Sequence, residues 1–521
     1  MEVTAPAAAA KLSFRRFSFV QKIVLAAVLA ALADHLFFFQ RVGATAGLFA
    51  AALLIALLGT TPAIGRSKPA LAAATAALLL AMALADDPSL LTAALFMTAA
   101  TLAALLPRAR AFDDGWRWTK RLAMHLLLSA IAPLLDWGRL RAARRRRGRT
   151  RIAALLPLLA LPVLGTALFL ALFSAANPLI SSAFERVDLF MLAGGFSVSR
   201  FFFWLLATLL VWSVLRPPRV LLARSRESAG PIPLPGVSPA SVALSLAAFN
   251  AVFALQNGLD IAFLWSGAPL PGRMTLADYA HRGAYPLIAT ALLAALFVLV
   301  TLRPGSATAE SPLVRRLVYV WIAQNIVLVA STMLRTFDYI ESYSLTSLRI
   351  AALVWMALVA IGLILICVRL WRRKSDAWLI NANLAAALLA LSACAAVDLG
   401  AVAAQWNVRH AREVGGRGVR LDLCYLNGLG ASALVPLVEL ESRPIAPRFR
   451  ERVSWTRNLI MDRLVTSQGD WHGWTYRDAR RLSEARRRIA ERGLPRFSAS
   501  RRACDGRPIG TSGFDSRRAG M

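Results

Sequence analysis

The segment ASVALSLAAFNAVFALQNGLDIAFLW, residues 240–265, decides the class of this protein's fold. It exceeds the roughly 20 mostly apolar residues that a helix needs to cross a bilayer. The polar residues Asn250, Gln256, Asn257 and Asp260 interrupt it. The spacing of Asn250, Asn257 and Asp260 places these three on one face of a helix. Polar groups inside a bilayer need partners, so we expect this face to contact other helices.

The whole chain has the composition of a membrane protein. Of its 521 residues, 57% are hydrophobic and only 17% are charged, whereas about 25% of residues are charged in ordinary soluble domains. These values exclude a soluble enzyme, a disordered chain and a fibrous protein. They predict an all-α fold, namely a polytopic bundle of transmembrane helices.

Eleven segments approach or exceed the length and apolar character of a membrane span. One further apolar stretch, 122–136, is shorter and has basic flanks, so we predict that it lies in the membrane interface. The predicted spans are 18–39, 42–58, 70–85, 90–107, 152–175, 198–215, 240–265, 284–302, 317–334, 350–370 and 378–403.

The placement of the basic residues orients these spans. The chain has a net charge of +31, and its densest basic run, from Arg139 to Arg151, lies between hydrophobic segments. Loops of this kind stay in the cytoplasm, beside anionic lipid headgroups, so we expect a lipid contact there and no nucleic acid. Eleven spans then put the N-terminus in the cytoplasm and the tail, 404–521, in the periplasm of a bacterial inner membrane. If 378–403 does not span, the tail lies inside instead.

The sequence divides into five predicted regions. The tail is predicted to be helical, and residues 475–492 form its clearest helix, which stops at Gly493. The regions are 1–151, N-terminal membrane helices with a basic cytoplasmic loop; 152–239, two membrane helices and a proline-rich linker; 240–403, a membrane core; 404–495, a helical tail that we expect to be periplasmic; and 496–521, a disordered basic end.

The polar face of the span 240–265 is the best candidate site. An ionisable residue within a span is by default a functional hypothesis, which here would be a transport or channel-like path. The alternative is that the polar groups only hold helices together by hydrogen bonds. The candidate residues of this membrane site are Asn250, Asn257, Asp260, Gln324, Asn325 and Asp398.

A second candidate site is a cluster of charged residues at the outer membrane face. Ordinary surface ion pairs are the alternative interpretation. The cluster comprises Asp278, Tyr279, Arg282, Arg335, Asp338, Glu341 and Arg349. The chain contains no nucleotide-binding loop, hydrolase elbow or metal-ligand spacing. It therefore predicts no catalytic residue, no metal and no cofactor, and an enzyme is the least supported function.

The four cysteines do not form a recognisable motif. Cys367 and Cys394 lie in apolar runs, where a thiol packs as a small apolar group. Cys424 and Cys504 lie in the tail and could pair if the tail is periplasmic. They are 80 residues apart without a spacing motif, so the sequence leaves this pairing open.

Three segments together resemble a family of uncharacterised bacterial multi-pass membrane proteins. These segments are Phe249-Asn250 through Trp265 followed by Asp278 to Gly283; Thr336 to Tyr339 through Ser344 to Ile350; and Asn381 through Asp398 to Val408. They are similar to domain of unknown function 4173, which is related to domain 4153, and the resemblance covers roughly 240–440. It implies a membrane location and carries no known activity.

Two main functions are compatible with these features of the sequence. The first is transport through the polar stripe of 240–265. The second is a non-enzymatic signalling, envelope-maintenance or assembly role, in which the tail binds a protein partner.

Overall fold

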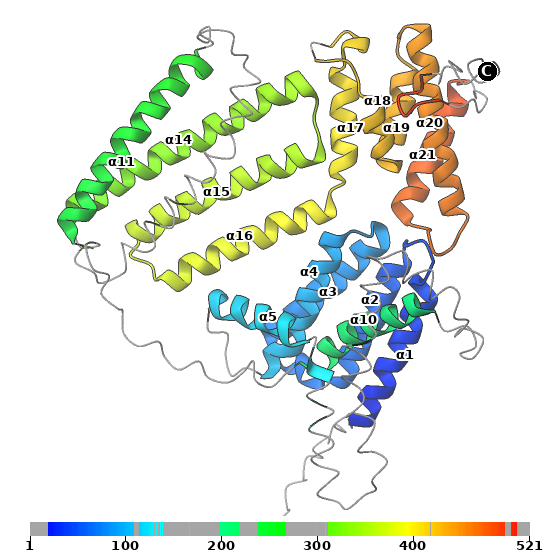
Figure 1. Ribbon diagram of the computed structural model, residues 1–521, viewed down its shortest axis with the longest axis horizontal. Helices are drawn as coiled ribbons and strands as arrows, with labels where there is room; N and C mark the ends of the chain where they lie inside the picture. The colour runs from blue at the N-terminus through cyan, green and yellow to red at the C-terminus, as the bar shows by residue number, and fades with distance from the viewer. Residues whose placement is uncertain are drawn as a thin grey trace, which may run out of the picture. The chain divides into compact units, whose positions relative to one another are not determined.

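The computed structural model is an all-α protein, which confirms the predicted fold class (Figure 1). The structure describes residues 19–108, 114–129, 131–133, 136, 138, 166, 197–217, 238–266, 293, 297, 308, 311–416, 418–494 and 502–507. The chain divides into two compact units. Unit 1 comprises Met1–Ala81, Phe96–Phe112 and Lys120–Ala223, and unit 2 comprises Met82–Leu95, Asp113–Thr119 and Arg224–Met521.

Eight helices in the described part of the chain are long and apolar enough to cross a membrane, and each overlaps a predicted span. Helix α2 (Thr45–Thr60) corresponds to the predicted span 42–58 but has only 16 residues. Apart from single positions, the predicted spans 152–175 and 284–302 lie outside the described residues, so the total of eleven stays a prediction. The eight are Phe19–Phe37 (α1), Lys68–Asp86 (α3), Leu90–Arg108 (α4 with a 3-10 end), Val198–Leu215 (α10), Pro239–Trp265 (α11 with a π-helical end), Pro312–Tyr343 (α14), Ser347–Trp371 (α15) and Asp376–Ala396 (α16).

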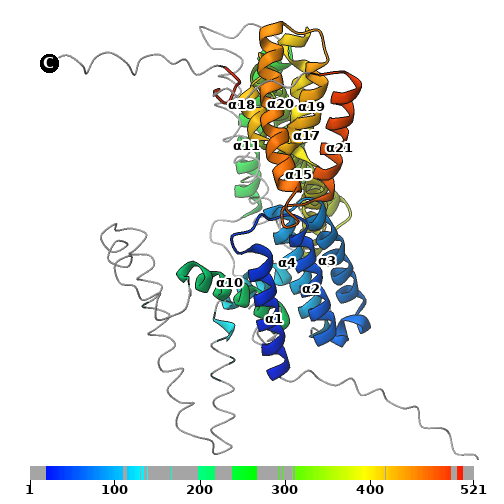
Figure 2. The ribbon, with the colours of Figure 1, turned by 90° about the vertical axis from the view of Figure 1, so that its right-hand side faces the viewer.

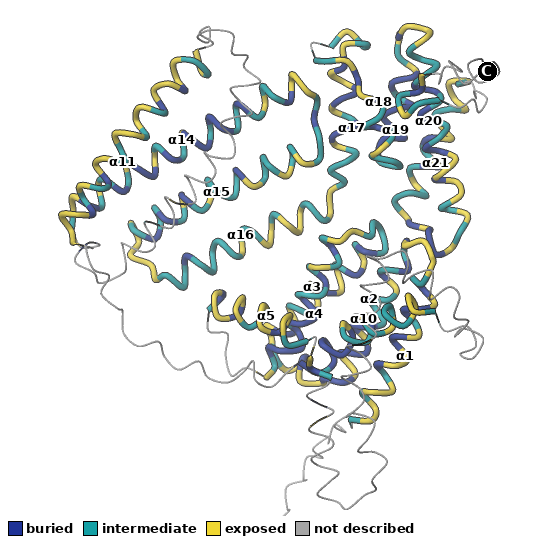
Figure 3. The backbone as a smooth tube through the Cα atoms, viewed as in Figure 1, coloured by how far each residue is buried: buried dark blue, intermediate teal, exposed yellow. Residues whose placement is uncertain are grey.

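Apolar side chains cover the outer faces of these helices, as contact with lipid requires. On α11, Leu244, Val252 and Leu255 are 75%, 63% and 67% exposed. Figure 3 shows such exposed positions recurring along α11, α15 and α16. In water these faces would promote aggregation, whereas hydrocarbon tails match them. The chain is therefore an integral membrane protein.

In unit 1, α1 packs against both α2 and α10 (Figure 2). The ammonium group of Lys22 donates a hydrogen bond to the carbonyl of Leu215 at the end of α10, at 2.8 Å. Helix α5 (Gly115–Ser129), the candidate interfacial helix, is divided between unit 2 and unit 1 and begins seven residues before the predicted stretch 122–136. It starts early because the Asp114 carboxylate accepts the backbone N–H of Arg117 at 2.8 Å and so caps the first turn.

In unit 2 the helices α11, α14, α15 and α16 pack in chain order, each against the next (Figure 1). Helices α11 and α14 both begin with a Ser-Pro pair, in which the serine caps the helix and the proline occupies its first position. The side chain of Trp321 on α14 packs against Phe249 and Phe253 of α11, with ring centroids 5.4 and 5.7 Å apart. Aromatic packing therefore accompanies the polar contacts between these two helices.

The predicted span 378–403 is two helices, and its predicted end is wrong. Helix α16 stops at Ala396, Val397 is extended, and α17 (Leu399–His410) then runs in a different direction (Figure 1). Asp398 causes this break, because its side chain accepts the backbone N–H of Ala401 at 3.0 Å and caps α17. The expected boundary at 403/404 thus falls inside α17.

Helix α17 belongs to a compact helical domain, called here the C-terminal domain. Its apolar core includes Leu426, Leu434, Leu437 and Val453, all fully buried. The pairing that the sequence left open is present: a disulfide joins Cys424 to Cys504, while Cys367 and Cys394 are free thiols. The domain consists of α17, α18 (Leu423–Gly428), α19 (Ala431–Glu441), α20 (Pro447–Gln468), α21 (Tyr476–Glu491) and residues 502–507.

Candidate functional site

Side chains of α11 and α14 form a line of polar contacts between the two helices, called here the polar seam. The amide nitrogen of Asn250 donates to the carbonyl of Leu317 at 3.1 Å. Gln324 in turn donates to the amide oxygen of Asn250 at 2.7 Å. Two turns further along α11, the amide nitrogen of Asn257 donates to the carbonyl of Gln324 at 3.0 Å. Three of the predicted site residues are thus brought together.

The polar seam ends in a buried ion pair between Asp260 of α11 and Arg335 of α14. The Asp260 side chain has no exposed surface, and that of Arg335 is 3% exposed. Gln256 also donates to the Asp260 carboxylate at 3.0 Å. Burial of either charge alone is costly, so each group makes the other tolerable inside the membrane. The polar seam has the chemistry of a structural junction between two helices.

Two other residues of the predicted membrane site lie elsewhere. Asn325 is fully buried, but its amide nitrogen donates to the carbonyl of Trp321 on its own helix. The expectation that Asp398 belongs to the polar seam is wrong, because Asp398 caps α17 and pairs with Arg481 of α21. The aromatic Trp265 adds an unexpected contact by donating to the hydroxyl of Ser331 at 3.0 Å.

The described residues of the cluster predicted at the outer membrane face do not form one site. Arg335 donates a hydrogen bond to Asp260, and Arg349 donates to the backbone carbonyls of Tyr343 and Ser344. Asp338 is half-buried and Glu341 is exposed on the last turns of α14. Three further members lie outside the described residues, namely Asp278, Tyr279 and Arg282.

Unit 1 contains an ion pair between two candidate membrane helices that the sequence did not lead us to expect. Asp34 of α1 is buried, and its carboxylate accepts hydrogen bonds from the Arg200 guanidinium and, at 2.9 Å, from the Trp204 indole of α10. The available signal was simple: one acidic residue in the first span and one basic residue in the span 198–215. Each is costly in lipid unless it has a partner.

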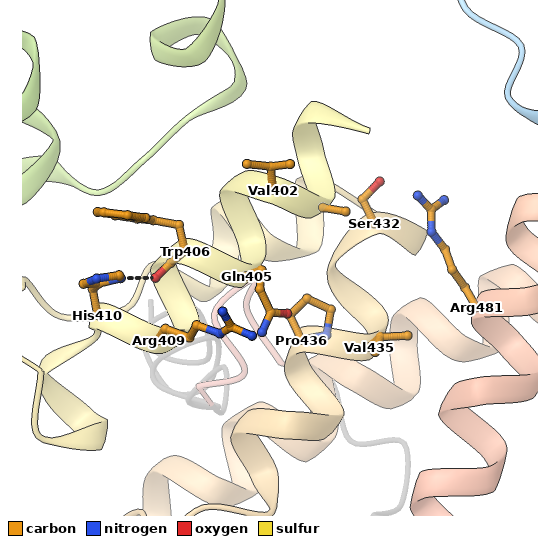
Figure 4. Close-up of a pocket in the computed structure, with 10 residues that line it drawn as sticks. Val402, Gln405, Trp406, Arg409, His410, Ser432, Val435, Pro436 and Arg481 are labelled. Atoms are coloured by element: carbon orange, nitrogen blue, oxygen red, sulfur yellow. Dashed lines mark hydrogen bonds between the residues drawn. The ribbon is translucent and has the colours of Figure 1, made fainter. Parts of the chain in front are cut away.

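The C-terminal domain contains a pocket of about 600 Å³, called here the C-terminal pocket (Figure 4). That volume lies within the ~300–1,000 Å³ typical of binding sites for small molecules. Its side chains come from three helices, α17, α19 and α21, and most of its surface is apolar. Its lining residues are Ala401, Val402, Gln405, Trp406, Arg409, His410, Ser432, Val435, Pro436 and Arg481.

One end of the C-terminal pocket is aromatic and basic. Trp406 and His410 stack on successive turns of α17, with ring centroids 3.9 Å apart (Figure 4). The exposed guanidinium of Arg409 makes no hydrogen bond or close ion pair with any residue that the structure describes. Tryptophan and arginine are the residue types that most often dominate binding energy at interfaces.

A network of polar side chains holds the floor of the C-terminal pocket. Gln405 donates to one carboxylate oxygen of Glu439 and Arg443 donates to the other, at 2.8 and 2.7 Å. Partial burial opposes ionisation of Glu439, but these two hydrogen bonds and the charges of Arg443 and Arg409 together lower its pKa. Glu439 is therefore a carboxylate at neutral pH and fixes Gln405 in place.

The described residues contain no group of three or more His, Cys, Asp or Glu side chains that could hold a metal ion. The C-terminal pocket offers an apolar wall, an aromatic pair and a cation. Such a lining can hold an apolar side chain together with an anionic group.

Comparison with known protein families gives a match. The model of a family described as Domain of unknown function (DUF4153) matches residues 72–440. This range begins well before the resemblance at 240–440 and ends within α19, so α20 and α21 lie beyond it. The more specific similarity to domain 4173 stays a prediction. No curated protein and no solved structure matches the chain.

Proposed function

We propose that this chain, which belongs to the DUF4153 family, is a non-enzymatic signalling or assembly component that binds a protein partner through its C-terminal pocket. The observation that carries this proposal is the combination of an apolar wall with the exposed cation of Arg409. The matching ligand is a segment of a protein that presents an apolar side chain next to a carboxylate. The pocket accommodates the first, and Arg409 pairs with the second.

We propose further that the C-terminal domain lies in the periplasm of a bacterial inner membrane, with the N-terminus in the cytoplasm. The Cys424–Cys504 disulfide supports this side, because such bonds persist in oxidising compartments. Two loops predicted to lie outside also contact the domain. The amide of Asn407 exchanges hydrogen bonds with the backbone of Leu345 at 2.7 and 2.8 Å, and Arg477 pairs with Asp86 and Asp87.

The same orientation leaves the basic loops in the cytoplasm. The run from Arg139 to Arg151 would then lie beside anionic headgroups, which attract such segments by about 1 kcal/mol per basic residue. Periplasmic reporter fusions after Arg151 and after Gln405 test this arrangement. We expect no activity at the first position and activity at the second. The reverse result at either position would contradict the proposed orientation.

Site-specific photo-crosslinking in cells tests the partner. A crosslinking amino acid at Val402 or Val435 should give one defined adduct, and Arg409→Glu should abolish it by reversing the charge. The control position is Arg448, which is exposed on α20 and does not line the C-terminal pocket. An adduct that survives Arg409→Glu, or that forms equally from position 448, contradicts the proposal.

Transport is a second candidate, and the buried Asp260–Arg335 pair is the observation that favours it. Intramembrane carboxylates of this kind occur in proton relays. Proton flux into vesicles that contain the purified chain tests this candidate. If the chain conducts protons, Asp260→Asn should abolish the flux at unchanged protein level, and absence of flux from the parent chain would remove the candidate.

A further inference from the structure

The loop between α20 and α21, together with the first residue of α21, exposes three aromatic side chains within six residues. Trp471, Trp474 and Tyr476 are 53%, 40% and 57% exposed. They are called here the aromatic loop. Single exposed aromatic residues are ordinary, but a group of this size on one short segment indicates an interaction surface. These residues line neither the C-terminal pocket nor the polar seam.

The aromatic loop is held in one conformation by its own hydrogen bonds. The Asp470 carboxylate accepts the backbone N–H of His472, and the Asp470 carbonyl accepts that of Gly473, both at 3.0 Å. The buried His472 ring packs against Trp471 with ring centroids 3.8 Å apart. The exposed rings are therefore presented by a structured turn, so little conformational entropy is lost when they bind a surface.

The residue after Tyr476 locates the aromatic loop relative to the bilayer. The guanidinium of Arg477 donates to the carboxylates of Asp86 and Asp87, each at 2.8 Å, and to the carbonyl of Ala396 at 3.1 Å. Asp86 ends α3, Asp87 follows it in the turn to α4, and Ala396 ends α16. Arg477 is thus bound where candidate membrane helices end, which is the level of the lipid headgroups.

We infer that the aromatic loop inserts into the headgroup region of the adjacent leaflet and anchors the C-terminal domain on the bilayer. Tryptophan and tyrosine are enriched at this depth because each has an apolar ring and a polar N–H or O–H. The exposed Arg480, whose guanidinium lies 6.0 Å from the Tyr476 ring, adds a cation that lipid phosphates attract. The position beside the span ends selects the bilayer over a protein partner.

Depth-dependent quenching of the full chain in lipid vesicles tests this inference. An environment-sensitive fluorophore is attached to Trp474→Cys, in a background where Cys367 and Cys394 are replaced by alanine. The vesicles contain phosphatidylcholine and phosphatidylglycerol, with a nitroxide either on the headgroup or deep in the acyl chain. We expect strong quenching by the headgroup nitroxide and several-fold weaker quenching by the deep one.

The matched control is Arg448→Cys, because position 448 lies at the opposite end of α20, about 30 Å along the helix. We expect no quenching there. Equal quenching at positions 448 and 474, or none at 474, overturns the inference. A blue-shifted emission at 474 without lipid quenching would assign the loop to a protein partner or a second copy of the chain, and would also overturn it.

Two further measurements guard against a folding artefact. Each labelled variant must retain the Cys424–Cys504 disulfide, which is read from its mobility before and after reduction. Tyr476→Cys supplies a second labelling site if Trp474→Cys does not fold, and the same quenching pattern is expected there. None of these measurements uses the C-terminal pocket, so the result is independent of the proposed partner.

Discussion

The polar seam and the core of the C-terminal domain each contain a fully buried pair of an arginine and a carboxylate. In the seam, Asp260 pairs with Arg335, and in the C-terminal domain Glu441 pairs with Arg457 at 3.0 Å. In both pairs the side chains are at most 3% exposed. The same chemistry thus occurs between two membrane helices and inside a domain with an apolar core.

The two surroundings give the same pair different roles. Lipid tails are as apolar as leucine, so hydrophobic burial does not drive α11 onto α14 and their polar contacts contribute to the association. In the C-terminal domain the buried leucines already drive folding, and a buried ion pair there is often no more stable than apolar residues of the same volume. We therefore expect the Glu441–Arg457 pair to select one arrangement of α19 and α20. The Asp260–Arg335 pair should instead hold α11 and α14 together.

The largest expected effect comes from breaking the pair in the C-terminal domain. Arg457→Leu leaves Glu441 buried beside the Ser454 hydroxyl as its remaining described hydrogen-bond partner, which should cost about 3–5 kcal/mol. Hydrogen exchange of the α19 and α20 amides in the solubilised chain measures this loss. The double variant Glu441→Leu, Arg457→Leu should recover stability, because it buries no charge. A double variant as unstable as the single one would contradict this role.

The same variant has a pH dependence with a definite sign. Burial raises the pKa of Glu441, so the folded state favours the protonated carboxyl. The stability contributed by that proton is present below the unfolded value of about 4.3 and is lost as pH rises through the folded pKa. The deficit of Arg457→Leu should therefore shrink as pH falls, and a constant deficit would show that charge burial is not its cause.

A smaller effect is expected from breaking the pair in the polar seam. Arg335→Leu should cost at most about 2.5–3.5 kcal/mol, the insertion penalty of a charge at the centre of a membrane helix. Gln256 still donates to Asp260 and offsets part of this cost. Unfolding of the chain in bicelles by steric trapping measures the change. If the pair holds the helices together, the double variant Asp260→Leu, Arg335→Leu should remain less stable than the parent, unlike the double variant in the C-terminal domain.

The amide contacts of the polar seam should contribute still less. Asn250→Leu should destabilise the membrane part by roughly 0.6 kcal/mol, the average for a hydrogen bond between membrane helices. Asn257→Leu should behave alike, because it also donates to α14. Val252→Leu on the exposed face of α11 is the control and should change nothing. A loss of several kcal/mol at Asn250 would indicate a role beyond a single hydrogen bond.

The smallest expected effect is at the C-terminal pocket. Partial burial opposes ionisation of Glu439, but hydrogen bonds from Gln405 and Arg443 outweigh it and lower the pKa of this carboxyl. The stability that the carboxylate contributes is therefore present above the unfolded pKa of about 4.3, and it is lost as pH falls through the folded pKa. Glu439→Gln should cost about 0.3–0.5 kcal/mol at neutral pH, as for other i,i+4 ion pairs, and nothing in acid. Thermal unfolding of the parent chain and of Glu439→Gln, at neutral and at acidic pH, measures the difference in stability. A difference that increases in acid would contradict the lowered pKa of Glu439.

The membrane spans were readable from the sequence because hydropathy is a local property. Most described spans begin and end close to the predicted limits. Two exceptions are 317–334, where α14 continues to Tyr343, and 378–403, where the cap formed by Asp398 starts a new helix after α16 has ended. A side-chain cap was visible as a possibility, but an aspartate near a span end is equally compatible with a continuing helix. Only the path of the chain after Val397 distinguishes the two.

The candidate residues were partly readable for the same reason. Spacing along α11 placed Asn250, Asn257 and Asp260 on one face, and the cost of polar groups in lipid predicted that this face meets another helix. The sequence could not choose the partners. Asp260 and Arg335 are 75 residues apart, and Asp398 was as plausible a neighbour until its own contacts were known.

The sequence alone therefore determined that this protein is an all-α membrane protein, since the transfer of apolar side chains into lipid depends on residue type and segment length. The tertiary structure decided which charges meet, that Cys424 lies against Cys504, and that the aromatic loop lies beside Arg477 and the ends of membrane helices. Such contacts depend on how helices pack across long stretches of chain. Helical periodicity specifies a face but not the neighbour that covers it.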